Sequence, residues 1–277
     1  SWKKLKSRMT HIDGEKISEE ILSELEEVEE SPKLKIILAG DNEGSKKFVE
    51  EKLEAAERIG FQAELEKFPE DVEEEKLIEE IEESNKSSKT HGVLVQLPLP
   101  DHIDENRVFE KLDPRKDVDG LTPENMGKTL RGTPEILPGA VEAVEKILKQ
   151  EIGEENFEGL EVTIINNSNL IGKPLSMILT EKGATVILCN KYTEDLEKYT
   201  REVDVVVTAT GVRGVLTPDM ISEDSIVIDA GYSLGKGDIE DKKAISKKTV
   251  FCGVPGGVGP VTVAVTMKNL LRCYRNQ

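Results

Sequence analysis

The sequence predicts an α/β protein of two lobes, each built on parallel strands. Two observations support this: short apolar runs recur along the chain, and segments with helical spacing of apolar residues separate them. Alternating strands and helices place successive strands parallel, with helices on the faces of the sheet. Ligands of such folds bind at the carboxyl ends of the strands. A chain of 277 residues is long enough for two buried cores.

The first lobe begins with an amphipathic segment whose stripe includes Ile17, Ile21 and Leu25. Helices are expected at 15–30, 45–59 and 70–84, and strands at 34–39, 61–68 and 93–97. Pro98 and Pro100 stop the third strand, because proline has no N–H to donate. The spacing of apolar residues typical of helices and of strands weakens over 117–135, and the boundary between the lobes is expected near 118–137.

A second α/β series follows this weakly patterned segment. Helices are expected at 138–150, 172–183 and 261–271, and strands at 162–165, 184–189, 203–208, 225–229 and 250–254. Pro174 falls in the first turn of its helix, where its missing N–H costs nothing. The expected domains are 1–120 and 121–258, with a final helix, 259–277, that packs back on the first domain.

A loop rich in glycine and proline precedes the final helix. Residues 254–262 read Val-Pro-Gly-Gly-Val-Gly-Pro-Val-Thr. Glycine tolerates positive φ and proline restricts φ, so this run specifies an unusual backbone. Its N–H groups should lie near a helix N-terminus, which suits a flat or anionic ligand that approaches the main chain. A loop of this composition can also be simple punctuation between elements.

Composition narrows the class of protein. The residues are 37% hydrophobic and 33% charged, and the net charge of −18 argues against nucleic-acid or membrane-surface partners. No apolar run reaches the roughly 20 residues of a membrane span. The basic N-terminal stretch 1–6 lacks the apolar core of a signal peptide, and three widely spaced cysteines fit reduced thiols, so we expect a cytoplasmic protein without a metal. The acidic runs are expected to be solvated helix faces.

Several segments, in order, resemble the bifunctional methylenetetrahydrofolate dehydrogenase/methenyltetrahydrofolate cyclohydrolase family. They are Ile12-Asp13-Gly14, Phe48-Val49-Glu50-Glu51-Lys52, Val95-Gln96-Leu97-Pro98-Leu99-Pro100, Lys116-Asp117-Val118-Asp119-Gly120, Ser168 with Gly172-Lys173-Pro174, and the loop 255–262. The resemblance implies an N-terminal catalytic lobe, a C-terminal Rossmann-type dinucleotide-binding lobe and a folate cleft between them. It also implies a homodimer that serves one-carbon metabolism and purine biosynthesis.

Three residues carry the catalytic role in this resemblance. Lys52 matches the catalytic lysine, and hydration of a methenyl bridge requires a proton-transfer group whose pKa is lowered towards neutrality. Gln96 matches the residue that orients and tunes that lysine. Asp119 matches the pterin-binding carboxylate, which can accept paired hydrogen bonds from an amino-pyrimidine edge. Taken alone, these residues also read as a surface lysine, a strand-end glutamine and an Asp-Gly turn.

The folate contacts implied by the resemblance are Phe48, Val95, Leu97, Pro98, Pro255, Gly256 and Gly257. Phe48 replaces the family's tyrosine, so it keeps a ring for stacking and loses the hydroxyl. A family segment of Pro-Cys-Thr-Pro type becomes Glu135-Ile136-Leu137-Pro138, so no role of that Cys and Thr carries over. These departures put the balance of the two activities in question.

The implied cofactor contacts are Asn166, Asn167, Ser168, Gly172, Lys191, Thr210, Gly211, Gly231, Tyr232 and Thr262. Asn166 and Asn167 stand where the family has Gly-Arg, and asparagine is the non-glycine residue that best tolerates positive φ. An acid at the end of the second strand would bind a ribose 2′-hydroxyl and repel a 2′-phosphate. No acid occurs there before Glu194, and Lys191 supplies a positive charge, which favours NADP over NAD. A solvated loop lysine is the alternative reading of Lys191.

The leading hypothesis is an enzyme that oxidises 5,10-methylenetetrahydrofolate with NADP and hydrolyses the methenyl product to 10-formyltetrahydrofolate. One alternative keeps the dehydrogenase and loses most of the cyclohydrolase, because Phe48 lacks a hydroxyl. Another is a non-catalytic dinucleotide-binding regulatory protein, against which the joint presence of Lys52, Gln96 and Asp119 argues.

Overall fold

The computed structural model describes residues 11–153, 157–233, 235–246 and 248–277, so the basic stretch 1–6 lies outside the described residues. The chain divides into two compact units, which we describe separately. The three-stranded unit comprises Ser18–Gly139 and Val263–Gln277, and the five-stranded unit comprises the described part of 1–17 with Ala140–Thr262. The prediction of two α/β units with parallel sheets is confirmed.

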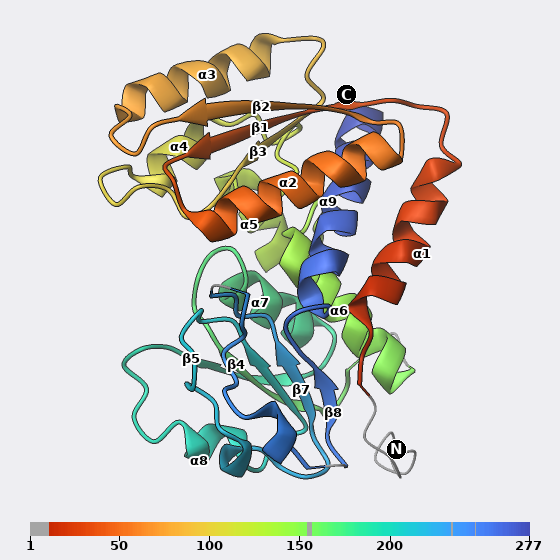
Figure 1. Ribbon diagram of the computed structural model, residues 1–277, viewed down its shortest axis with the longest axis vertical. Coiled ribbons are helices and arrows are strands. Elements are labelled where there is room, and N and C mark those ends of the chain that lie inside the picture. The colour runs from red at the N-terminus through yellow and green to blue at the C-terminus, as the bar shows by residue number, and fades with distance from the viewer. Residues whose placement is uncertain (1–10, 154–156, 234, 247) are drawn as a thin grey trace. The chain divides into compact units, whose positions relative to one another are not determined.

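The three-stranded unit has strand order β2-β1-β3, and both pairings are parallel (Figure 1). Its strands are β1 (Lys33–Ala39), β2 (Gln62–Phe68) and β3 (Gly92–Val95), and its helices are α2 (Glu43–Arg58), α3 (Glu74–Lys86), α4 (Glu105–Lys111) and α5 (Pro123–Leu130). The central strand β1 is buried from Leu34 to Ala39, as expected of a strand covered on both faces. In Figure 1, α2 and α3 cover opposite faces of this sheet.

Two short helices in this unit were not predicted. They escaped because helices of seven and eight residues are too short to show periodicity. The residues that cap these two helices can nevertheless be recognised in the sequence. Asp104 accepts a hydrogen bond from the N–H of Asn106 at the start of α4, and Thr122 caps α5, whose first residue is Pro123.

Several predicted elements are shorter than expected, and three of them show why. Helix α1 (Gly14–Glu26) ends before the acidic residues 27–30, which are unfavourable at the negative end of a helix dipole. Helix α3 begins at Glu74, because the residues after Pro69 form a turn in which the N–H of Val72 bonds the carbonyl of Pro69. Strand β3 ends at Val95, two residues before Leu97-Pro98, since proline restricts the residue before it and has no N–H to donate to a strand pairing.

The five-stranded unit has strand order β5-β4-β6-β7-β8, all parallel. Its strands are β4 (Glu161–Ile165), β5 (Thr185–Cys189), β6 (Val205–Thr208), β7 (Ile226–Asp229) and β8 (Val250–Cys252), and its helices are α6 (Gly139–Ile152), α7 (Gly172–Glu181) and α8 (Glu197–Thr200). The chain leaves β4 towards β5 on one side and later returns to β6 on the other. This reversal creates a switch point between the carboxyl ends of β4 and β6, where doubly wound sheets bind ligands.

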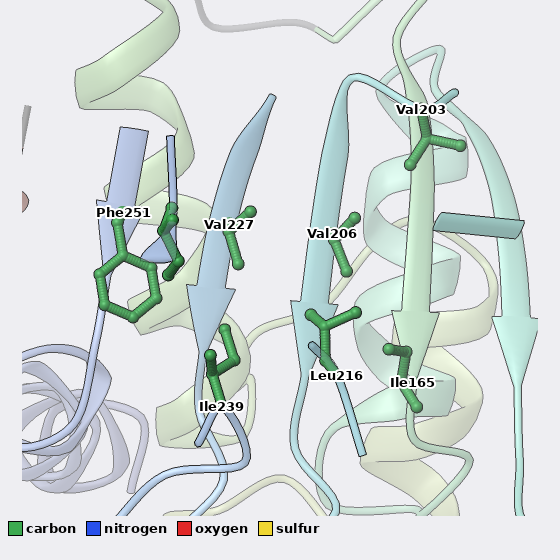
Figure 2. Packing of buried hydrophobic residues seen from close by; sticks show 8 residues of the cluster. Ile165, Val203, Val206, Leu216, Val227, Ile239 and Phe251 are labelled. Atoms are coloured by element: carbon green, nitrogen blue, oxygen red, sulfur yellow. The ribbon is translucent and has the colours of Figure 1, made fainter. Parts of the chain in front are cut away.

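One face of this sheet is covered largely by connecting segments. Val206, Val227 and Phe251 lie in register on three adjacent strands, and Figure 2 shows them on the same side of the sheet. Leu216 and Ile239 pack over them from the segments that contain the 3-10 turns η2 (Pro218–Met220) and η3 (Lys242–Ala244). This packing holds the connections that leave β6 and β7.

The final helix is α9 (Val258–Arg275), longer at both ends than the predicted apolar run 261–271 and close to the predicted final helix 259–277. It includes Pro260 because a proline in the first turn sacrifices no intrahelical hydrogen bond. Asn269 on this helix is fully buried, and its amide donates to the carbonyls of Val118 (2.9 Å) and Leu137 (2.8 Å). No helix among the described residues has both the length and the apolar character needed to cross a membrane.

The acidic runs do more than face solvent. Glu80, within one of them, lies 2.9 Å from the buried ammonium of Lys35, which also contacts Glu64 and Glu66. Other acidic residues form surface ion pairs with arginines from distant elements: Glu26 with Arg58, Glu74 and Glu75 with Arg107, and Glu30 with Arg275. The buried ammonium of Lys35 therefore offsets part of the negative charge of the three carboxylates around it.

Candidate functional site

Lys52 and Gln96 form a buried pair at the carboxyl end of β3. The Lys52 side chain projects from α2 and is only 5% exposed, which is unusual for a lysine on an amphipathic helix. Its Nζ donates to Oε1 of Gln96 at 2.7 Å. The amide orientation of Gln96 is consistent with a second bond, from Nε2 to the carbonyl of Leu97 at 2.8 Å. The glutamine is thereby held rigidly against the amine.

Burial shifts both ionisable groups of this site towards their neutral forms. The pKa of Lys52 is lowered by desolvation, although the negative charges of Asp119 and Glu51 oppose that shift. The pKa of Asp119 is raised by desolvation and by the charge of Asp117, against the effects of Lys52 and the N–H of Gly139. A lysine amine with a lowered pKa can take a proton from water, which an ordinary ammonium cannot.

Two buried residues of the same segment, Lys116 and Asp117, anchor it to other elements and were not singled out from the sequence. The buried Lys116 ammonium donates to the carbonyls of Ser84 (2.9 Å), Asn85 (2.8 Å) and Ser87 (2.7 Å), and so caps the C-terminal end of α3. Asp117 is also buried. Its Oδ2 accepts from the N–H of Thr122 (2.8 Å) and from Nδ2 of Asn125 (2.9 Å). A lysine and an aspartate directly before Val118-Asp119 were the available signal, but their partners are distant in sequence.

The predicted folate contacts are distributed over both units. Phe48, Val95, Leu97 and Pro98 belong to the three-stranded unit, with Lys52, Gln96 and Asp119. Phe48 lies one helical turn before Lys52 on α2 and is partly exposed. Val95 ends β3, and the carbonyl of Leu97 accepts from Nε2 of Gln96 and from Oγ of Ser45 (3.3 Å). This segment therefore forms one hydrogen-bonded group with the lysine.

Pro255, Gly256 and Gly257 lie in the five-stranded unit, directly before α9. Gly256 has φ +83°, and its carbonyl accepts from the N–H of Gly14 at 2.8 Å. A Cβ on Gly14 would lie 1.9 Å from the carbonyl oxygen of Gly257, so only glycine fits at this approach. This contact explains why Ile12-Asp13-Gly14 and the distant Gly/Pro loop occur in the same chain.

The loop after β4 is organised by the side chain of Asn166. Its Oδ1 accepts from the N–H of Ser168 (2.8 Å), from Oγ of Ser168 (2.7 Å) and from the N–H of Gly172 (3.0 Å). Its Nδ2 donates to the carbonyl of Ala209 at 2.7 Å. Because Ala209 follows β6, this one side chain joins the two strand ends at the switch point.

Neither Asn166 nor Asn167 has the positive φ that asparagine tolerates. Asp195 is the only non-glycine residue with positive φ among those described. Asn166 replaces glycine here through its amide, which makes the bonds that shape the loop, and not through backbone freedom. The N–H of Gly172 at the start of α7 is bonded to Asn166, and the N–H of Lys173 bonds the carbonyl of Ser168 at 3.0 Å. These two amides of the helix start already have partners within the protein.

The other predicted cofactor residues follow successive strands. Lys191 comes after β5, is exposed, and has its ammonium 5.1 Å from the centre of the Tyr192 ring. Thr210 and Gly211 come after β6, and Gly231 and Tyr232 after β7. Thr262 lies in α9, where its hydroxyl donates to the carbonyl of Val258 at 2.9 Å, so its oxygen can serve only as an acceptor.

In the described part of the chain, no group of three or more His, Cys, Asp or Glu residues is arranged so that it could hold a metal ion. The cysteines Cys189, Cys252 and Cys273 are free and buried. Burial raises the pKa of the Cys252 and Cys273 thiols to about 12, so neither is a nucleophile near neutral pH.

Comparison with known proteins agrees with this arrangement. Residues 12–119 match the catalytic domain, and residues 138–277 the NAD(P)-binding domain, of tetrahydrofolate dehydrogenase/cyclohydrolase. The chain is 38% identical to the bifunctional protein FolD of Hydrogenobaculum sp. (strain Y04AAS1), over 97% of this chain and 100% of that relative.

Solved structures agree as well. The bifunctional enzyme FolD from Campylobacter jejuni has 36% identity and a TM-score of 0.89, covering 97% of this chain and 99% of that one. FolD from Trypanosoma brucei, complexed with NADP cofactor and inhibitor, has 30% identity and a TM-score of 0.89, covering 97% and 98%. This chain therefore belongs to the tetrahydrofolate dehydrogenase/cyclohydrolase family.

Proposed function

We propose that this protein oxidises 5,10-methylenetetrahydrofolate to the 5,10-methenyl form with NADP and hydrolyses that product to 10-formyltetrahydrofolate. The observation that carries the proposal is the buried amine of Lys52, held 2.7 Å from Oε1 of Gln96 in a chain of this family. A buried lysine beside a neutral amide suits proton transfer better than a purely structural role.

In the hydrolysis, Lys52 acts on water. As the water oxygen bonds to the cationic methenyl carbon, one of its protons passes to the neutral Lys52 amine. The hydroxyl on that carbon then loses its proton and becomes the formyl carbonyl, the bond from the carbon to N5 of the folate breaks, and N5 takes up a proton, so the formyl group remains on N10. One proton is released overall, which balances the positive charge of the substrate. Gln96 keeps the amine in place, and the amino-pyrimidine edge donates to Asp119.

In the oxidation, NADP accepts the hydride and the protein supplies binding and orientation. The strand ends of the five-stranded unit fit a dinucleotide, because Asn166 joins the loops after β4 and β6 at the switch point and Gly211, at φ +70°, leaves the backbone accessible. The segment after β5 carries Lys191 and no acid before Glu194, which supports NADP over NAD. Asn167, Ser168 and Gly172 would lie on the pyrophosphate side of this site.

Two alternatives remain distinct from the proposal. Phe48 in place of tyrosine favours a dehydrogenase with little hydrolase activity. A non-catalytic dinucleotide-binding protein would need neither the buried Lys52 nor its glutamine partner.

One assay separates these three. The protein is mixed with methylenetetrahydrofolate and NADP⁺, and NADPH, methenyl and formyl products are quantified after chromatography. NADPH with formyl product supports the proposal, NADPH with accumulated methenyl product supports the dehydrogenase alone, and no NADPH supports the non-catalytic protein.

The compartment, the oligomeric state and the metabolic role of the protein are also proposed. We propose a cytoplasmic homodimer that supplies one-carbon units for purine biosynthesis. Free, buried cysteines support a reducing compartment. The dimer rests on the resemblance to the family, and light scattering on the purified protein, with a mass of twice 30.7 kDa expected, tests it.

The pH dependence of hydrolysis tests the role of Lys52. Because burial lowers its pKa, the amine loses its proton at a pH below the ordinary value of 10.5, and the base is the neutral form. We expect the hydrolysis rate constant to rise with pH through this lowered pKa and then level off. A rate that stays constant or falls across this range contradicts the assignment of Lys52 as the base. The same shift means that the unfolded chain binds more protons there, so the free energy of unfolding should also rise with pH.

Phe48 provides a test of the ratio of the two activities. In the Phe48→Tyr variant we expect the hydrolysis rate to rise relative to oxidation by roughly 2- to 13-fold, since one neutral hydrogen bond contributes about 0.5–1.5 kcal/mol. The Phe48→Ala variant should lose both activities, because the stacking surface is removed. Both rates are measured in one buffer for all three proteins. An unchanged ratio in the tyrosine variant, or normal activities in the alanine variant, contradicts this role.

A further inference from the structure

Two aspartates are fully buried near the carboxyl edge of the five-stranded sheet. Asp229 ends β7, and Asp238 follows a few residues later in the connection to β8. Burial raises the pKa of Asp229, and the neighbouring charge of Asp238 adds to that shift. Two carboxylates so close together in a protein interior are costly, so their hydrogen bonds indicate what they hold.

Asp238 binds the strand end where the cofactor candidates of β6 lie. Its Oδ2 accepts from the hydroxyl of Thr208, from the N–H of Thr210 at 2.7 Å and from the hydroxyl of Thr210 at 2.9 Å. Both polar donors of Thr210 therefore converge on one carboxylate oxygen. Thr210 is partly exposed, whereas Thr208 and Asp238 are not.

Asp229 and two glycines hold Asp238 in position. Asp229 accepts from the N–H of Asp238 (3.0 Å) and from the N–H of Ile239 (3.1 Å), which ties the backbone of this segment to β7. A Cβ on Gly231 would lie 2.0 Å from Oδ1 of Asp238, and one on Gly237 would lie 2.1 Å from Oδ2 of Asp229. Each carboxylate thus occupies space that a glycine leaves open. Any side chain at Gly231 would displace Asp238.

The carboxylate also sets the direction of hydrogen bonding at Thr210. The hydroxyl of Thr210 donates to Oδ2 of Asp238 at 2.9 Å, so the hydroxyl hydrogen points to Asp238. The same hydroxyl oxygen accepts from the N–H of Val212 at 3.0 Å and keeps one further acceptor site. A ligand group that meets this oxygen must therefore be a hydrogen-bond donor, such as a ribose hydroxyl or a carboxamide N–H.

We propose that Asp238 is a positioning residue for the nicotinamide-riboside half of NADP. It holds the segment 208–211 in place through Thr208 and Thr210, and it presents the Thr210 oxygen as an acceptor to a donor group of the cofactor. It acts through Thr210 and does not itself contact the ligand. This proposal rests on the proposed function, because it takes NADP as the ligand of these strand ends.

The Asp238→Asn variant tests the proposal, since it keeps the shape and removes the charge. We expect the Kd for NADP⁺, measured by calorimetry, to rise about tenfold, as charge-assisted hydrogen bonds to one loop are weakened. Hydrolysis of supplied methenyltetrahydrofolate, which needs no NADP, should stay within about twofold of wild type. The matched control is Asp204→Asn. Asp204 is a buried aspartate directly before β6, so it lies at the amino ends of the strands, opposite the carboxyl ends where NADP is proposed to bind. It accepts from the N–H of Glu161 at 3.0 Å. That control should bind NADP⁺ normally even if it is less stable.

Thr208→Val provides a second route if the Asp238 variant does not fold. It removes one donor to Asp238 while keeping the buried shape, and we expect the Kd for NADP⁺ to rise about threefold. Where both variants fold, the combined variant should bind no worse than Asp238→Asn alone, because both changes break the same contact. Additive effects, or an Asp238→Asn or Thr208→Val protein that binds NADP⁺ as wild type does, overturn the positioning role and leave the proposed function intact. A wild-type protein that does not bind NADP⁺ overturns both.

Discussion

Replacing Lys52 with alanine should abolish the hydrolysis of methenyltetrahydrofolate, with a loss of about 10²- to 10⁴-fold in the rate constant, the range typical of a positioned acid–base group. Folate binding should remain largely intact, because Phe48, Asp119 and the segment after β3 are still present. The measurement is the disappearance of the methenyl substrate at saturating concentration, with folate affinity determined separately by calorimetry.

Lys52→Arg should fail as completely, because a guanidinium keeps its proton near neutral pH and cannot serve as a base. The matched control is Lys47→Ala. Lys47 lies on the same helix, is half exposed and has Glu51 3.7 Å from its ammonium, so its loss should leave both rates unchanged. Hydrolysis at a near wild-type rate in either Lys52 variant rules out the catalytic assignment.

The second large effect is expected at Lys191. In the Lys191→Ala variant the Kd for NADP⁺ should rise about tenfold, because a charge-assisted bond to a phosphate contributes roughly 1.5–3 kcal/mol and exposure to solvent reduces it. The Kd for NAD⁺, which lacks the 2′-phosphate, should stay nearly constant. The net charge of −18 sharpens this expectation, since a 2′-phosphate near an acidic protein needs a local positive group.

Lys198 offers a control of the same chemistry. Its ammonium lies 5.9 Å from the centre of the Tyr199 ring, much as that of Lys191 lies near Tyr192, and it is also exposed. Lys198→Ala should leave both dissociation constants unchanged. Raising the salt concentration should weaken NADP⁺ binding to wild type more than to Lys191→Ala. If both cofactors lose affinity equally, or neither does, Lys191 is a surface residue without a role in selectivity.

The comparison of sequence and structure separates local from long-range information. Local pattern was sufficient for most elements, because a buried strand such as β1 or an amphipathic helix such as α2 is specified by the spacing of its own apolar residues. Helix ends were less predictable. The start of α3 and the end of α1 depend on turns and charges whose effect is comparable to the propensity of single residues.

Contacts between residues far apart in sequence could not be predicted, even within the family's motifs. Asn166 was expected to tolerate an unusual backbone, but it acts through an amide that reaches Ala209, 43 positions away in sequence. Nothing in the sequence indicates that Asp229 and Asp238 are buried together, because a buried aspartate is indistinguishable in sequence from one in a surface turn. Only packing against Gly231 and Gly237 distinguishes them.

By itself, the sequence determined the α/β class, the order of the strands and of the longer helices, and the loops in which the candidate ligand-binding residues occur. Tertiary structure alone decided that Lys52 is buried, that its amine meets Gln96 across 44 positions of sequence, and that β6 lies beside β4. The physical reason is that periodicity reports which face of an element is apolar, whereas the pKa of a lysine depends on the atoms that surround it. Those atoms come from other elements, and only the folded chain brings them together.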